Sequence, residues 1–272
     1  MNEQDKKRVD RLMSRVRQRA KLPSCEEVVA QSFERLGIRE EHFSPQMVLA
    51  EFGSLLSRVS VESLVVLEEH EERCYSEGIP VEITGEHEAE VGAASDLARE
   101  QGFRAGFVWL FSRLYPVIYR CFLSVSQSRK MRGGTDLELQ IERLFGMARL
   151  PFEKHVEKER TDFILPNYQT HESNRNLAMV VSVKRTLRER WRQVAEELFS
   201  MRSPNVFLFT GDRKISKGHV ESICGRYNIY LVVWDDLKRE KFQEESLVLG
   251  FTEWATERLS VIRSHWPYPY RA

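Results

Sequence analysis

The stretch from residue 180 to residue 197 constrains the fold more than any other part of the chain. It opens with an apolar run, residues 180–183, that ends at Lys184. Apolar residues then recur at helical spacing, at Leu187, Trp191, Val194, Ala195 and Leu198. This pattern predicts a buried strand that leads directly into an amphipathic helix over residues 187–202. A lysine at the end of a buried strand is unfavourable without a partner, so Lys184 is a candidate functional residue.

The second half of the chain alternates between strand and helix patterns. Strands are predicted over residues 162–165, 177–184, 206–209 and 228–234, and further helices over residues 216–227 and 245–263. Strands separated by helices indicate an α/β protein with α/β/α layers.

The first 78 residues show only helical patterns. Four short helices are predicted, over residues 4–20, 24–36, 44–59 and 60–75, which together indicate a small all-helical N-terminal domain over residues 1–78. Such a domain most often mediates oligomerisation or packs on the main domain, and the basic first helix leaves added DNA contacts as the alternative. A second domain is then expected over residues 79–272, beginning with an acidic linker that carries one short helix.

A long apolar and aromatic stretch follows the linker. Residues 103–128 predict a helix that is buried in the main domain and is kinked or divided at Pro116. A basic turn, residues 129–134, precedes another helix over residues 137–147. Backbone N–H groups of this turn and the side chain of Arg132 could bind a phosphate, or the turn could be a plain loop.

Charge and hydropathy narrow the class of protein. The chain has 41 basic and 41 acidic residues, but residues 1–21 are basic and residues 77–100 are acidic, so the zero net charge hides local potentials. No apolar run approaches the ~20 residues that a membrane span needs. The N-terminal residues lack the apolar region of a secretory signal, so a cytoplasmic protein is expected. The four cysteines and seven histidines are scattered, with no Cys-x-x-Cys or His-x-x-x-His pair, which argues against a transition-metal site.

Three residues around the opening stretch suggest a chemistry. Asp162 begins a predicted strand, Lys184 ends the next one, and Glu197 lies on the helix that follows. Two carboxylates and the backbone carbonyl of Val183 are oxygen ligands of the kind that Mg²⁺ prefers. A lysine beside such a metal could orient or deprotonate a water for phosphodiester hydrolysis. Each of these residues alone could have a purely structural role. It is their combined spacing within one short segment that favours a catalytic site.

A charged run at the start of the same helix suggests sequence reading. Arg188, Glu189 and Arg190 lie on a helix whose polar edge also carries Glu197. Arginine suits the paired acceptors of guanine, and glutamate can accept a hydrogen bond from cytosine N4. Taken alone, the run is more often a solvated helix start.

Residues 132–236 resemble the type II restriction endonucleases of the PD-(D/E)xK superfold, and within them the group of the EcoRII catalytic domain. The likeness rests on Arg132-Gly133-Gly134, Glu138, residues 141–145, residues 161–166, Lys184, and residues 190–197. Two positions depart from the pattern, because Thr161 stands where proline is usual and Arg188 where EcoRII has lysine. The N-terminal 78 residues do not resemble the effector domain of EcoRII, so its two-site activation does not carry over.

The resemblance implies a restriction-endonuclease-like core with a central mixed sheet, in a prokaryotic protein. It implies that Asp162 and Glu197 bind Mg²⁺, that Lys184 is the catalytic lysine, and that Glu138 is an acidic residue near the metal. Arg188, Glu189 and Arg190 would read a CC/GG half-site. The expected substrate is double-stranded DNA with a palindromic site that contains CCGG, in the form WCCGGW where W is A or T. A palindromic site calls for a homodimer, with higher oligomers through the N-terminal domain as a further option.

Two rival functions remain open at this stage. The first is a repair or recombination nuclease of the same fold that cuts mismatched or branched DNA. The second is a non-catalytic DNA-binding or assembly protein in which the acidic residues are structural.

Overall fold

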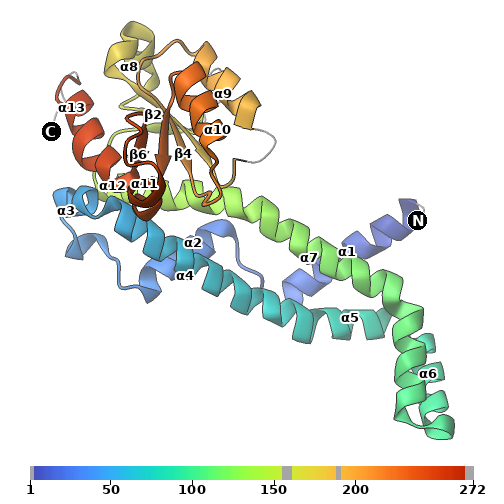
Figure 1. The fold of residues 1–272 in the computed structure, drawn as a ribbon. Helices are drawn as coiled ribbons and strands as arrows, with labels where there is room; N and C mark the ends of the chain where they lie inside the picture. The colour runs from blue at the N-terminus through green and yellow to red at the C-terminus, as the bar shows by residue number, and fades with distance from the viewer. Residues whose placement is uncertain (1–2, 155–160, 188–190, 267–272) are drawn as a thin grey trace. The chain divides into compact units, whose positions relative to one another are not determined.

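The computed structural model describes residues 3–154, 161–187 and 191–266, and it divides into two compact units (Figure 1). The helical unit comprises Met1–Val28 and Leu64–Arg132, and the sheet-bearing unit comprises Val29–Ser63 and Gly133–Ala272. The boundary predicted near residues 78–80 lies inside the helical unit. Residues 29–63, expected in an N-terminal domain, belong to the sheet-bearing unit.

The sheet-bearing unit contains a mixed six-stranded sheet in the order β1-β2-β3-β4-β5-β6. The strands are β1 Glu153–Lys154, β2 Phe163–Leu165, β3 Met179–Lys184, β4 Val206–Thr210, β5 Tyr230–Val233 and β6 Val248–Gly250. The first three strands pair antiparallel, and β3 to β6 pair parallel. The predicted α/β fold with a central mixed sheet is confirmed.

Helices flank this sheet in Figure 1. They include α3 Pro45–Ala50, α8 Tyr168–Ser173, α9 Trp191–Ser200, α10 Lys217–Val220 with the π-helical turn Glu221–Arg226, α11 Asp235–Lys241, α12 Phe251–Glu253 with the π-helical turn Trp254–Arg258, and α13 Leu259–Arg263. The short 3₁₀ helices are Glu40–His42 and Arg175–Leu177. Helix α2 Cys25–Arg35 and helix α4 Phe52–Arg73 contribute residues to both units.

An aromatic cluster forms the centre of the sheet-bearing unit. The ring centroids of Phe145 and Phe163 lie 5.4 Å apart, and those of Phe209 and Trp254 lie 4.8 Å apart. Phe52, in a segment expected to form a separate domain, packs 5.9 Å from Phe145 and is fully buried. Residues 52–59 belong to this unit because their apolar side chains complete its core.

The helical unit is built from α1 Glu3–Arg19, the π-helical turn Cys74–Gly78, α5 Ile79–Glu86, α6 Glu88–Gln101 and the first part of α7 Phe103–Met147. Its core includes Leu12, Val16, Cys74, Leu114, Cys121 and Val125. Glu82 accepts from Arg15 at 2.7 Å and from Arg19 at 3.0 Å, which ties α1 to α5. Within the described residues, no helix is long and apolar enough to cross a membrane.

Four local predictions are wrong. Residues 79–102 form α5 and α6 instead of a linker with one helix. Helix α7 runs through residues 129–134, where a turn was expected; it also contains Pro116, so of the two alternatives there only the division is excluded. The break expected near residue 59 occurs at Glu51, between α3 and α4. The last helix begins at Phe251, because residues 248–250 form β6.

Two physical reasons explain these errors, and the first is that packing outweighs local propensity. Leu114, Cys121 and Val125 on α7 are buried, so extending the helix past Pro116 gains more than the missing hydrogen bond loses. Strands β1 and β6 have two and three residues, which is too short for an alternating pattern to show in the sequence.

Candidate active site

The candidate site lies where β2 and β3 pair antiparallel. Phe163 stands opposite Val181, so Asp162, one residue before β2, reaches the end of β3. Oδ2 of Asp162 accepts hydrogen bonds from Ser182 Oγ at 3.0 Å, from Val183 N at 2.5 Å and from Lys184 Nζ at 3.0 Å. The acid and the lysine predicted from the sequence are therefore partners.

Partial burial strengthens the ion pair of Asp162 and Lys184. The Asp162 side chain is 13% exposed and the Lys184 side chain 35% exposed. Charge–charge interactions in such a position are screened less than on an open surface. The pair explains why a lysine is tolerated at the end of a strand whose other residues are buried.

Glu138 joins the pair from α7. Burial first, and then the negative charge of Asp162, raise the pKa of its carboxyl group from 4.5 to about 7, against the opposing charges of Lys184 and Lys154. The repulsion by Asp162 is the smaller of the two causes, and it places the two carboxyl groups in the same site. Glu138 was predicted near the metal centre, and the structure brings it together with Asp162 and Lys184.

The rotation of α7 about its axis is fixed by a buried polar network. Gln140, 1% exposed, donates to Ser63 Oγ at 3.1 Å and accepts from Ser60 Oγ at 2.5 Å. On the same side of α7, Ile141 and Leu144 enter the core. With this side held inward, Glu138 is directed to the edge that faces β2 and β3.

Two charged residues beside the site were missed by sequence reasoning. Lys154 on β1 forms an ion pair with Glu142 of α7, with Nζ and Oε2 2.5 Å apart. Lys154 pairs with Phe163 across β1 and β2, next to Asp162. Glu142 lies four residues after Glu138, a spacing that places both on one helix face and was visible in the sequence. Nothing in the sequence revealed Lys154, because β1 has only two residues.

Asp212 holds the segment that follows Lys184. Its carboxylate accepts from the backbone N–H of Leu187 at 2.8 Å and of Lys214 at 2.8 Å. The N–H of Gly211 donates to the carbonyl of Lys184 at 3.3 Å. A Cβ at Gly211 would lie 3.3 Å from Leu137 of α7, so a side chain there would press on the helix that carries Glu138. The end of β4 therefore positions the exit from β3.

The other predicted residues have different standings. Glu197 lies on α9 and accepts from Gln193 Nε2 at 3.0 Å, as expected for residues on one helix face. Within the described ranges, no three His, Cys, Asp or Glu side chains form a metal-binding group. Val183 contacts Asp162 through its N–H, and its carbonyl remains a predicted ligand. Arg188, Glu189 and Arg190 lie outside the described residues, and Arg132 is described only as part of the backbone of α7.

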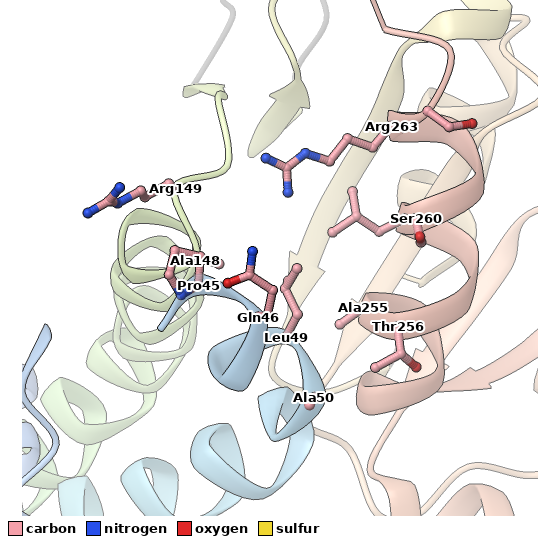
Figure 2. A pocket seen from close by; sticks show the side chains of 12 residues that line it. Pro45, Gln46, Leu49, Ala50, Ala148, Arg149, Ala255, Thr256, Ser260 and Arg263 are labelled. Carbon is pink, nitrogen blue, oxygen red and sulfur yellow. The ribbon is translucent and has the colours of Figure 1, made fainter. Parts of the chain in front are cut away.

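A separate cavity of about 620 Å³ lies elsewhere in the sheet-bearing unit, and none of the predicted site residues lines it. It is formed by α3, the end of α7 and the helical segment after β6, and Figure 2 shows Gln46 and Arg263 extending into the space between these elements. The candidate site is thus an edge of the sheet and not this cavity.

The thiols take no part in the site. Cys74, Cys121 and Cys224 are buried, and Cys25 is partly exposed. Burial raises the pKa of Cys121 to about 11 and that of Cys224 to about 12, which keeps both groups protonated at neutral pH.

A two-carboxyl, one-lysine site on a mixed sheet is the arrangement of the restriction-endonuclease fold, and comparisons agree with this class. Residues 117–253 match the family model described as EcoRII C terminal. The chain therefore belongs to the EcoRII C-terminal family. The matched range contains Glu138, Asp162, Lys184 and Glu197, and the resemblance to the EcoRII group is confirmed.

Individual proteins are similar over part or all of the chain. The type II restriction enzyme SsoII of Shigella sonnei is 29% identical in an alignment of 165 residues that covers 56% of this chain and 54% of that enzyme. The chain thus aligns with about half the length of this relative. A structure of metal-depleted Ecl18kI in complex with uncleaved, modified DNA is 19% identical with a TM-score of 0.79, over 96% of this chain and 88% of that chain.

A complex of the restriction endonuclease PspGI with substrate DNA is similar at a lower level. It is 16% identical with a TM-score of 0.60, over 90% of this chain and 95% of that chain. At these identities, the two structures show that the fold is shared.

Proposed function

We propose that the chain is a sequence-specific type II restriction endonuclease that hydrolyses phosphodiester bonds of double-stranded DNA. The observation that carries the proposal is the contact of Asp162 with Lys184 beside the raised-pKa carboxyl of Glu138. Membership of the EcoRII C-terminal family supports it. The similar structures of Ecl18kI and PspGI are complexes with DNA, which supports it further.

Mg²⁺ is the proposed cofactor, and the donor set fits it. Asp162 and Glu138 present oxygen ligands at one place, and their repulsion leaves negative charge that a divalent cation would neutralise. Mg²⁺ is commonly held by one or two carboxylates together with waters and phosphate oxygens. When bound, the ion would lower the pKa of a water molecule and offset charge on the phosphate. Glu197 and the carbonyl of Val183 are the further ligands predicted from the sequence.

The side chains of the site have separate roles in this mechanism. Lys184, held by Asp162 at 3.0 Å, donates hydrogen bonds to the attacking water and to the phosphate, so it orients the one and stabilises charge on the other. Ser182 and the N–H of Val183 fix the Asp162 carboxylate. With a pKa of about 7, Glu138 can accept or release a proton at neutral pH.

Sequence specificity is assigned to the residues that follow β3. Arg188, Glu189 and Arg190 would read a CC/GG half-site in the major groove, and Arg132 would contact the phosphate backbone. A palindromic site that contains CCGG, in the form WCCGGW, would be cut by a homodimer in which each subunit hydrolyses one strand. As part of the same proposal, the single enzyme that this chain would resemble in specificity is BsaWI, whose site would be WCCGGW.

Cleavage of a DNA library tests both parts of this proposal. The protein is incubated with Mg²⁺ and DNA that contains randomised sequence, and the ends of the products are sequenced. Ends that map to one CCGG-containing palindrome would support the whole proposal. Discrete ends at a different palindrome would support the endonuclease activity but contradict the CCGG-containing recognition site. No cleavage with Mg²⁺ or Mn²⁺ would contradict the endonuclease activity itself.

Substitution of a reading residue separates recognition from catalysis. Arg190→Ala should lose the specific complex, with a loss of about 1–3 kcal/mol for each bidentate contact, while nonspecific binding remains. Equal weakening of binding to all sequences would show that Arg190 contacts only the backbone.

A further inference from the structure

The cavity of about 620 Å³ is separate from the candidate active site. It is bounded by α3, by the end of α7 and by the helical segment after β6, all within the sheet-bearing unit. Ala148 on its wall lies about 15 Å along the helix direction from Glu138. Small-molecule sites commonly have volumes of about 300–1,000 Å³. The cavity is therefore large enough to hold a ligand of its own.

Arg263 of α13 is a positively charged group of this cavity that lacks a partner. Its Nε atom is buried and has no hydrogen-bond partner among the described residues. Burial lowers the pKa of its guanidinium group below the usual range, and no carboxylate of the described residues opposes this shift. Figure 2 shows the side chains of Arg263 and Gln46 extending into the cavity. A partly buried cation without a partner is unfavourable, so an anionic ligand would stabilise it.

Arg149 adds a second positive charge, at an exposed position on the rim of the cavity. It follows the end of α7, where Arg149 N donates to Gly146 O at 2.9 Å and Leu150 N donates to Phe145 O at 3.0 Å. These two hydrogen bonds form a Schellman motif, in which the residue at the position of Arg149 is usually glycine. Arg149 has a φ of 50° there. An arginine kept in this strained conformation indicates a role for its side chain.

The hydrogen-bonding groups of the wall favour an anion. None of the described residues that line the cavity is acidic. Thr256 and Ser264 already donate their hydroxyl protons, to the carbonyls of Thr252 at 2.8 Å and Val261 at 2.7 Å, so their oxygens can only accept. The main donors left for a ligand are the two guanidinium groups and the amide of Gln46. Such donors bind a carboxylate or a phosphate group.

The rest of the wall is aliphatic. It includes Leu49, Ala50, Ala148, Ala255 and Leu259. No aromatic ring is among the described residues that line the cavity, so a nucleobase would find no ring on which to stack. An aliphatic wall instead suits an alkyl chain, which is stabilised when it leaves water. The two parts of the wall thus call for a ligand with an alkyl body and an anionic head.

We propose that this cavity binds a small amphiphilic anion, whose alkyl body packs on the aliphatic wall and whose carboxylate or phosphate group pairs with Arg263 and with the charge of Arg149. The planar guanidinium group of Arg263 can donate two parallel hydrogen bonds to such a head group, one of them from the buried Nε. The proposal does not rest on the nuclease activity, because none of the predicted catalytic residues lines the cavity.

Isothermal titration calorimetry of the intact protein with octanoate and with octyl phosphate tests this proposal. At least one of them should bind at a single site with a Kd of about 0.1–1 mM, and the tighter of the two identifies the head group. Octanol and inorganic phosphate each lack one half of the ligand and should bind at least about 10-fold more weakly. No binding of either octyl anion would overturn the proposal. Equally tight binding of octanol or of inorganic phosphate would also overturn it.

Substitutions at the two arginines separate ligand binding from a structural role. Arg263→Gln should raise the Kd by about 10-fold or more, because it removes the charged donors. Arg149→Gly should raise the Kd by up to about 5-fold, as expected for an exposed charge. Glycine suits the positive φ at this position, so Arg149→Gly should unfold at an equal or higher temperature. Weaker binding by a protein that is no less stable cannot come from damage to the fold.

Arg239→Gln, at an exposed position on α11, is the matched control and should leave the Kd unchanged. Far-ultraviolet circular dichroism checks that Arg263→Gln keeps its fold. If it does not, Arg263→Lys replaces it, and the Kd should rise by about 3-fold or more because lysine lacks the planar fork. Unchanged affinity in either arginine variant, or an equal loss in Arg239→Gln, would overturn the proposal.

Discussion

Helix α7 uses apolar residues in opposite ways along its length. Near its C-terminal end, Ile141 and Leu144 are buried, and the polar edge beside them carries Glu138 into the candidate site. Between residues 107 and 123 the large rings are exposed, while smaller residues face the core. The first segment packs its apolar side chains into a core, and the second leaves its large rings exposed. Hydropathy alone gives both segments the same character.

Loss of the lysine should have the largest effect at the positioning end. Lys184→Ala removes the ammonium that Asp162 holds, and single-turnover cleavage should slow by about 100- to 10,000-fold, the range for a positioned proton-transfer or charge-stabilising group. Specific DNA binding should remain. Lys241→Ala, at an exposed position on α11, is the control and should cleave normally. Full cleavage activity in Lys184→Ala would contradict the catalytic role proposed for Lys184.

The two faces of α7 should differ next in stability. Leu144→Ala leaves a cavity in the core and should lower the free energy of unfolding by about 2–5 kcal/mol. Phe107→Ala, at a position 57% exposed, should change it by less than about 0.5 kcal/mol in dilute protein. Urea denaturation at several protein concentrations measures both. A loss for Phe107→Ala that matches Leu144→Ala at every concentration would mean that the Phe107 ring is packed within a single chain.

A smaller loss is expected from the hydroxyl beside Asp162. Ser182→Ala removes one of three donors to a partly buried carboxylate and should lower the free energy of unfolding by about 1–2 kcal/mol. Ser264→Ala removes an exposed hydroxyl that donates to the carbonyl of Val261, and it serves as the control with little expected change. Equal values for the two variants would show that the Asp162 contacts contribute no more than a surface hydrogen bond.

The smallest expected effect is a pH dependence of stability that comes from Glu138 in the C-terminal part of α7. The pKa of Glu138 is about 7 in the folded chain, against an ordinary value of 4.5. Between pH 4.5 and about 7, Glu138 keeps its proton in the folded chain and releases it in the unfolded chain. The stabilisation of the folded chain by the protonated carboxyl group is therefore complete below pH 4.5 and is lost as the pH rises through about 7. In metal-free protein, the intact chain should therefore lose stability relative to Glu138→Gln between pH 5 and pH 8. A constant difference would contradict the raised pKa.

The sequence predicted the centre of the fold and part of the site. Strands β2 to β5 have enough consecutive apolar residues to be recognised, and the charges at Asp162 and Lys184 stand out because they border such runs. Lys154 and Asp212 act through contacts made only after the sheet forms, so no spacing along the chain reveals them. The prediction that the helix over residues 103–128 is buried in the main domain was wrong for its large rings, because an apolar helix pattern does not say which side is covered.

The three donors on Oδ2 of Asp162 also decide what an isosteric replacement would do. Asp162→Asn keeps the size of the side chain but has only one acceptor oxygen. Ser182, Val183 and Lys184 all direct protons at the same point, so they would draw that oxygen into the place of Oδ2. The amide NH₂ would then point where the other carboxylate oxygen stood, and a proposed cation would meet a donor there. The three donors would hold the amide in this orientation, with its NH₂ group directed at the cation. Asp162→Asn should therefore lower the affinity for Mg²⁺ more than Asp162→Ala does.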